Sequence, residues 1–125
     1  MPRKDIRSMD EFVRAYLECA LWATTDDGEP LDKLHTISDI APETVLEATE
    51  DCTSFRKNNA AALEGYPDTQ AGHDLFLTRC GHGTGFWDRQ QKYITEENEL
   101  ALTKAAEQMG EVWFYVSDEG KIYST

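Results

Sequence analysis

Residues 72–88 read Gly-His-Asp-Leu-Phe-Leu-Thr-Arg-Cys-Gly-His-Gly-Thr-Gly-Phe-Trp-Asp, and this stretch decides the fold class that the sequence predicts. Residues 74–79 alternate enough between polar and apolar side chains to predict a β-strand. The glycines of residues 81–85 are typical of a loop, and residues 86–88 can return from it as a second strand. The segment therefore predicts a β-hairpin in the second half of the chain.

Two helices are expected before this hairpin. Ser8 and Glu11 have the spacing of a capping box, so the first helix is predicted over residues 9–24. Pro42 suits the first turn of a second helix, which Gly65 and Pro67 end and whose C-terminal half the pair Asn58-Asn59 weakens. The inward faces of the two helices are marked by apolar side chains at helical spacing: Phe12, Val13, Tyr16, Leu17, Ala20 and Leu21, then Val45, Leu46, Cys52, Phe55, Ala62 and Leu63.

One further helix and a terminal hairpin are expected after residue 94. Thr95 is a good N-cap and Gly110 a good stop for the helix, and residues 112–123 form two strands around a turn. In the run of residues 113–115, Trp113 and Tyr115 face one side and Phe114 the other. The predicted fold is α+β: two N-terminal helices, then a small, mostly antiparallel sheet of about four strands with one further helix, all in a single domain of residues 1–125.

Charge and cysteine usage narrow the classes of function. The 125 residues contain 24 acidic and 12 basic side chains, a formal net charge of −12, and 40% hydrophobic residues. The negative charge argues against direct binding of nucleic acid and against docking on anionic membranes. Three cysteines without a C-x-x-C pair indicate a reducing compartment, and no apolar run is long enough for a membrane span. We expect a cytoplasmic protein.

Residues 72–88 also resemble the signature G-H-D-F-W-L-T-R-N-x-H-G-x-G-F-W-D of a family of small bacteriophage and mobile-element proteins. The similarity extends along most of the chain, including residues 20–22, 26–32 and 120–123. It implies a phage or plasmid setting and no particular activity, cofactor or catalytic residue. This chain departs from the signature at Leu75 and Phe76, where the family has Phe and Trp, and at Cys80, where it has Asn.

The polar residues of this segment form the first candidate site, for a ligand or a specific contact: His73, Asp74, Thr78, Arg79, His82, Gly83, Gly85, Trp87 and Asp88. The glycine loop could cradle a phosphate in a nest of backbone amides, but a predicted strand follows it where a dinucleotide site needs a helix. The plainer interpretation is a tight hairpin turn.

The same segment also contains the residue types of two other kinds of site, a zinc site and a catalytic cysteine. Imidazoles, a thiol and carboxylates supply enough ligands for zinc, but their spacing matches no common zinc module. A nucleophilic Cys80 with His82 as base requires a strand that continues through Gly81, a residue that indicates a turn. We therefore predict no catalytic residue, no metal and no cofactor.

The second candidate site is an acidic surface. Residues 26–51 contain nine acidic residues and one basic residue, whereas residues 52–92 are nearly neutral. Negative fields attract basic partners, although an acidic exterior also simply keeps a protein soluble. The candidate partner-binding residues are Asp26, Asp27, Glu29, Asp32, Glu43, Glu47, Glu50, Asp51, Glu96, Glu97 and Glu99.

The leading hypothesis is a non-enzymatic accessory protein, a monomer or small homo-oligomer, that binds a host protein with a basic surface. It would inhibit a nucleic-acid-handling or defence protein in the manner of an anti-CRISPR, anti-restriction or DNA-mimic protein. The alternative is a small protein that binds a nucleotide or phosphate ligand, or a small enzyme, using residues 73–88. A third possibility is a structural role in a larger assembly.

Overall fold

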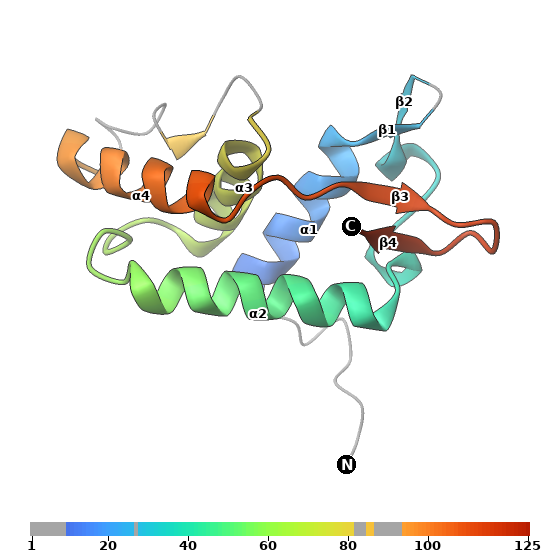
Figure 1. Ribbon diagram of the computed structural model, residues 1–125, viewed down its shortest axis with the longest axis horizontal. Helices are drawn as coiled ribbons and strands as arrows, with labels where there is room; N and C mark the ends of the chain where they lie inside the picture. The colour runs from blue at the N-terminus through green and yellow to red at the C-terminus, as the bar shows by residue number, and fades with distance from the viewer. Residues whose placement is uncertain (1–9, 27, 82–84, 87–93) are drawn as a thin grey trace, which may run out of the picture.

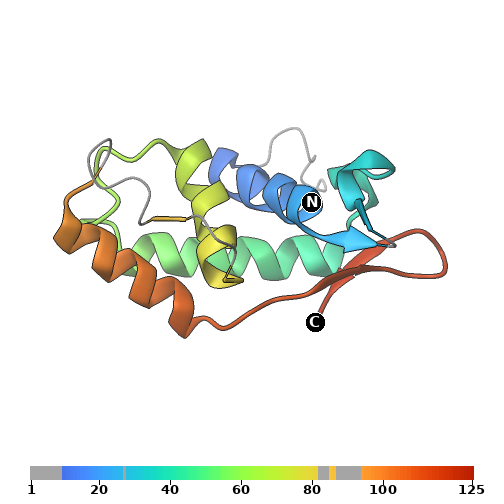
Figure 2. The ribbon, with the colours of Figure 1, turned by 90° about the horizontal axis from the view of Figure 1, so that it is seen from above.

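The computed structural model describes residues 10–26, 28–81, 85–86 and 94–125. Four helices account for most of them: α1 (Glu11–Ala23), α2 (Pro42–Asn58), α3 (Asp68–Arg79) and α4 (Glu96–Gln108). Two short antiparallel hairpins, β1–β2 (Thr25–Asp26 and Glu29–Pro30) and β3–β4 (Phe114–Val116 and Ile122–Ser124), lie at the same end of the molecule (Figure 1). Helix α2 runs along the length of the molecule, and α4 lies at the end away from the hairpins (Figures 1 and 2).

Helix α1 confirms the first predicted helix. Its N-cap is Asp10 and not the predicted Ser8, which lies outside the described residues. The Asp10 carboxylate accepts a hydrogen bond of 2.8 Å from the backbone N–H of Phe12. The same carboxylate oxygen accepts a bond of 2.9 Å from Arg56 of α2. Partial burial raises the pKa of Asp10, but the bonds from Arg56 and Phe12 outweigh it and leave the pKa below its ordinary value. The cap thus also ties the start of α1 to α2.

Helix α2 confirms the start of the second predicted helix but ends at Asn58, before the predicted end at Gly65. Pro42 occupies the first turn, where its missing N–H costs nothing. The helix ends at Asn58, and the side-chain amide of Asn59 donates a hydrogen bond of 2.9 Å to the carbonyl oxygen of Phe55. That bond competes with continuation of the helix, so the apolar residues beyond it lie in turns.

Helix α3 overturns the strand predicted over residues 74–79. The segment is the most deeply buried helix, with Asp74 and Thr78 inside as well as Leu75, Phe76 and Leu77. Because residues 74–78 are buried one after another, polar and apolar alike, this part of α3 carries no one-sided apolar stripe and lacks the period that reveals most helices. Gly81, with a φ of 71°, follows the C-terminus of the helix in the left-handed conformation.

The second predicted strand, residues 86–88, is also wrong where the structure describes it. Phe86 lies in a single helical turn and is fully buried. Its ring stacks on Phe55 at 5.8 Å and meets Tyr66 edge-on at 5.7 Å. Trp87 and Asp88 lie outside the described residues.

Gly72 explains how α3 reaches the centre of the fold. A Cβ atom at this position would lie 2.1 Å from the carbonyl oxygen of Phe12, so only glycine permits the observed approach of α3 to α1. The contact brings Phe76 against Tyr16 of α1, with ring centroids 5.4 Å apart. Gly72 is thus a packing residue between two helices.

Helix α4 and the β3–β4 hairpin confirm the helix and the hairpin predicted after residue 94. Thr95 caps α4 by accepting a bond of 3.2 Å from the backbone N–H of Asn98. In the β3–β4 hairpin, Phe114 is buried whereas Trp113 and Tyr115 are 65% and 49% exposed, as the alternation predicted. The predicted sheet of about four strands is wrong, because the described residues contain four α-helices, two 3₁₀ helices (Leu31–Lys33 and Ile37–Asp39) and only two-stranded sheets. No helix in the described ranges is long and apolar enough to cross a bilayer.

Candidate functional site

The described polar residues of the signature segment serve the interior of the fold. Asp74 of α3 is fully buried, and its carboxylate accepts hydrogen bonds from the hydroxyl of Tyr66 and from the side-chain amide of Gln70, the latter at 3.0 Å. The hydroxyl of Thr78 accepts a bond of 3.2 Å from the backbone N–H of Phe86. Buried polar groups with such partners hold structure together and are closed to solvent.

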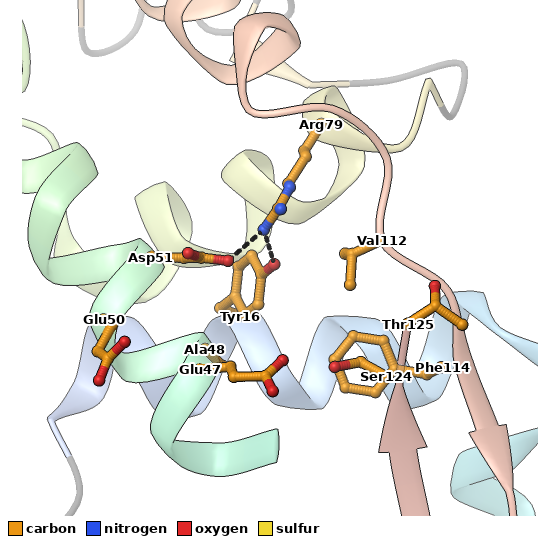
Figure 3. A pocket seen from close by; sticks show the side chains of 10 residues that line it. All are labelled: Tyr16, Glu47, Ala48, Glu50, Asp51, Arg79, Val112, Phe114, Ser124 and Thr125. Atoms are coloured by element: carbon orange, nitrogen blue, oxygen red, sulfur yellow. Dashed lines mark hydrogen bonds and ion pairs between the residues drawn. The ribbon is translucent and has the colours of Figure 1, made fainter. Parts of the chain in front are cut away.

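Arg79, at the end of α3, joins three helices and the loop after α4. Its Nη1 donates to the Asp51 carboxylate of α2 at 2.8 Å and to the Tyr16 hydroxyl of α1 at 2.9 Å (Figure 3). Its Nε donates to the carbonyl oxygen of Gly110 at 2.6 Å, which fixes the C-terminal end of α4. Burial raises the pKa of Tyr16 well above its ordinary value despite the nearby guanidinium, so the hydroxyl is neutral at physiological pH.

A pocket of about 220 Å³ lies over this network, between α2 and the β3–β4 hairpin. Figure 3 shows Tyr16, Asp51 and Arg79 on one side of it and Phe114 with Ser124 on another. Glu47 and Glu50 from α2 also line it. The Arg79 donors are already directed at acceptors within the protein. Because the carboxylates of Glu47 and Glu50 also line the pocket, it is unsuited to a phosphate.

The outer face of α2, residues 43–50, carries the clearest group of predicted partner-binding residues. Glu43, Glu47 and Glu50 are exposed and follow one another at the i, i+4, i+7 spacing of one helix face. No described residue forms an ion pair or a hydrogen bond with these carboxylates in the structure. Leu46, which is 58% exposed, lies in the same stretch. We call residues 43, 46, 47 and 50 the α2 face.

The other predicted acidic residues are scattered or already engaged. Asp51 is bound to Arg79, and Glu99 of α4 is buried, with Thr103 donating a hydrogen bond of 3.2 Å to its carboxylate. Glu29 pairs with Lys33 at 2.9 Å. Asp32 is exposed by itself, and Glu96 and Glu97 are exposed in the first turn of α4, where they favour the helix dipole.

Several predicted residues cannot be placed. Asp27, His82, Gly83, Trp87 and Asp88 lie outside the described residues. For Asp26 the structure gives the backbone, in β1. The glycine loop, and with it the phosphate-nest alternative, therefore stays a prediction.

The described residues form neither a catalytic cysteine site nor a metal site in the signature segment. His73 lies beside Trp22 of α1, with ring centroids 5.8 Å apart, and the two side chains line an open groove between α1 and α3. The Cys80 thiol donates to the carbonyl oxygen of Val112 at 3.4 Å, and burial raises its pKa, so it is not an activated thiolate. Across the described residues, no three metal-ligating side chains converge.

Sequence reasoning did not identify Tyr16 as a partner of Arg79 or Leu46 as an exposed residue. Leu46 was assigned to the inward stripe of its helix because every apolar residue at roughly helical spacing was counted as core. Its neighbours Glu47 and Glu50 were the available signal, since they place that side of the helix in water.

Comparisons with known proteins leave the relationship open. No protein-family model matches the chain, and neither the curated proteins nor the solved structures contain a significant match. The resemblance to the phage and mobile-element family therefore stays a prediction from the sequence.

Proposed function

We propose that the protein is an acidic binding module that recognises a basic surface on a partner protein through the α2 face. The observation that carries the proposal is the uncompensated row of Glu43, Glu47 and Glu50. Other carboxylates of the chain pair with a basic side chain, Asp10 with Arg56 and Asp51 with Arg79. No described basic side chain pairs with these three.

The spacing of the row supports a partner that normally binds nucleic acid. With a rise of about 1.5 Å per residue, three carboxylates between Glu43 and Glu50 fall within about 10 Å along the helix axis. Successive carboxylates are thus about 5 Å apart along the axis, a spacing of the same order as the roughly 3.4 Å between phosphates of one DNA strand. The α2 face can therefore take the place of a short run of phosphates in a partner's groove that is lined by cations.

Leu46 adds an apolar contact within the charged row. A leucine that is 58% exposed among carboxylates gives a partner a patch to desolvate, whereas the surrounding charges speed and orient the encounter. For a chain of phage or mobile-element origin, as the sequence resemblance suggests, the partner would be a host protein of nucleic-acid handling or defence, whose inhibition follows from occupation of its nucleic-acid groove.

The test is affinity capture from a bacterial host lysate with the tagged protein, at low and high salt. The variant Glu43→Lys/Glu47→Lys/Glu50→Lys reverses the row. The control Glu18→Lys/Glu64→Lys/Glu107→Lys makes the same change in net charge at exposed positions elsewhere. Captured proteins are then challenged with a 20-base-pair DNA duplex.

We expect the natural protein and the control to capture a nucleic-acid-binding protein that high salt and the duplex both release. The α2 variant should capture at least tenfold less of it while unfolding at an unchanged temperature. Equal capture by the α2 variant, or an absence of any captured protein at low salt, contradicts the proposal.

A further inference from the structure

We propose that the outer edge of β3 is a docking site for an extended, basic segment of the partner, which pairs with β3 as an additional strand. This inference rests on the proposed function, because it names a second contact made by the same basic partner. The edge, the groove beside it and the side chains around it each support the assignment.

The hydrogen-bond pattern of the hairpin shows which backbone groups are free. The backbone N–H of Thr125 donates to the carbonyl oxygen of Trp113 at 2.9 Å, two positions from the opposed pair Tyr115 and Tyr123. Antiparallel pairs alternate between bonded and non-bonded, so Tyr115 exchanges its bonds with β4. The backbone N–H and carbonyl of Phe114 consequently point away from β4.

Val116 repeats this arrangement one step further along the strand. The backbone N–H of Ser117 donates to the carbonyl oxygen of Lys121 at 2.7 Å, so Val116, like Phe114, is a non-bonded position of the ladder. Within the part of the chain that the structure describes, no hydrogen bond to the outward backbone groups of Phe114 or Val116 is present. The outer edge of β3 is therefore open over both positions.

The opposite edge of the hairpin is covered, which leaves β3 as the accessible side. The backbone N–H of Ala41 donates to the carbonyl oxygen of Ile122 at 2.8 Å, and Ile40 forms a parallel bridge with Ile122. This contact pairs part of the outer edge of β4 with the chain just before α2. It protects β4 from edge-to-edge pairing in the way that many natural sheets protect their edges.

A groove of about 300 Å³ lies along the start of the β3 edge. Thr24 and Thr25, at the end of α1 and the start of β1, form one wall, and residues 111–114 form the other. Phe76 and Cys80 of the α3 region also line it, so its interior is largely apolar. The groove thus lies between the end of α1 with the start of β1 and the segment that leads into β3. Both hairpins lie at this end of the molecule (Figure 1).

The strand β1 presents a second free position to this groove. The backbone N–H of Leu31 donates to the carbonyl oxygen of Thr24 at 2.9 Å, and Thr25 is opposed to Pro30 in the next pair. Proline has no N–H, so this pair is non-bonded and the backbone groups of Thr25 point outward. An extended segment in the groove would meet unpaired backbone groups on both sides, which is the basis of recognition by strand addition.

The surrounding side chains identify the occupant as basic. Tyr115 is exposed on β3 and Trp113 is exposed directly before it, and aromatic faces attract arginine and lysine side chains. Glu111 lines the groove, and Asp118 and Glu119 are exposed in the hairpin turn. A second copy of this chain would bring the same carboxylates into opposition, so charge complementarity favours a basic partner segment over self-association.

Amide hydrogen exchange measured by NMR tests the proposal at single residues. The probe is a capped nine-residue peptide of alternating arginine and threonine; its controls are a peptide with glutamate for arginine and one with alternate backbone amides methylated. With the basic peptide at saturation, we expect exchange at Phe114 and Val116 to slow at least tenfold and exchange at Tyr115, already bonded to β4, to stay unchanged. The two control peptides should give no protection.

A pair of proline variants provides the matched control. Val116→Pro removes an N–H from the outer edge of β3, and Ser124→Pro removes the equivalent one from β4, while neither takes a bond from the ladder. Only Val116→Pro should weaken binding of the basic peptide, by at least tenfold. If that variant does not fold, the methylated peptide performs the same test on the unaltered protein.

The outcomes separate this inference from the proposed function. Peptide binding that leaves Phe114 and Val116 unprotected, or an absence of peptide binding, overturns strand addition, while capture through the α2 face is decided by its own variants. If, in the absence of peptide, both amides become protected as the protein concentration rises, then a second copy of the chain occupies the edge. That result also overturns the proposal. Protection by the basic peptide with failed capture supports the edge site and contradicts the α2 face.

Discussion

Helix α3 and the α2 face are both rich in polar residues, yet the fold uses them in opposite ways. In α3, Asp74 and Arg79 are enclosed by neighbouring elements and bonded to named partners. On the α2 face, Glu43, Glu47 and Glu50 project into solvent without a described basic partner. The comparison teaches that a dense polar motif can be the internal scaffold of a protein, whereas a plain charged helix face can be its binding surface.

The difference has a simple energetic reason. A polar group that is buried without a partner costs several times what its hydrogen bond gains, so each one inside α3 requires a matching residue elsewhere in the chain. Such a residue therefore depends on a second residue elsewhere in the chain. An exposed carboxylate needs no intramolecular partner, because water solvates it.

The largest effect on stability is expected at Arg79. Arg79→Ala removes the donors to Asp51, Tyr16 and Gly110 together, and we expect the free energy of unfolding to fall by about 3 kcal/mol. Arg79→Lys should lower the free energy of unfolding less than Arg79→Ala does. Lysine keeps the positive charge, although it lacks the planar guanidinium whose donors reach several acceptors at once. Urea denaturation followed by circular dichroism measures both.

The control for Arg79 is Arg14→Ala, which breaks an exposed pair with Glu18 at 3.6 Å and should cost less than about 0.5 kcal/mol. If Arg79→Ala and Arg14→Ala lowered the free energy of unfolding equally, the polar residues of α3 would not have the internal, stabilising role described above.

Gly72→Ala should have the next largest effect. The added Cβ would collide with the carbonyl oxygen of Phe12, so α1 and α3 must separate, and we expect a loss of about 2 kcal/mol. Thr69→Ala, at an exposed position of the same helix, should change the free energy of unfolding by less than about 0.5 kcal/mol. A Gly72→Ala protein as stable as the natural one would show that the two helices are not in close contact.

The smallest effect on stability is expected on the α2 face. Glu43→Gln/Glu47→Gln/Glu50→Gln removes three charges that have no described partner, so we expect the free energy of unfolding to change by less than about 0.5 kcal/mol per substitution. Thermal denaturation at pH 7 measures the difference. A loss as large as that of Gly72→Ala would mean that these carboxylates stabilise the fold, and the contrast with α3 would disappear.

Local signals in the sequence predicted a large part of the fold. The apolar spacing of α1, Pro42 at the start of α2, Thr95 before α4 and the alternation around Phe114 each act within a few residues, and each is confirmed. The α2 carboxylates were predicted as candidate residues because residues 26–51 are rich in acidic side chains, whereas their shared, exposed helix face is a finding of the structure. Their partner stays a proposal.

Tertiary structure decided what the signature segment does. Its residues form a helix because Gly72 lets α3 lie against the α1 backbone, and because Tyr66, Asp51 and Tyr16 supply partners for its buried polar groups. Those partners are 8, 28 and 63 residues away in the chain. The sequence by itself determined the charge and the local helices, since these depend on neighbouring residues, whereas burial and pairing depend on residues that only folding brings together.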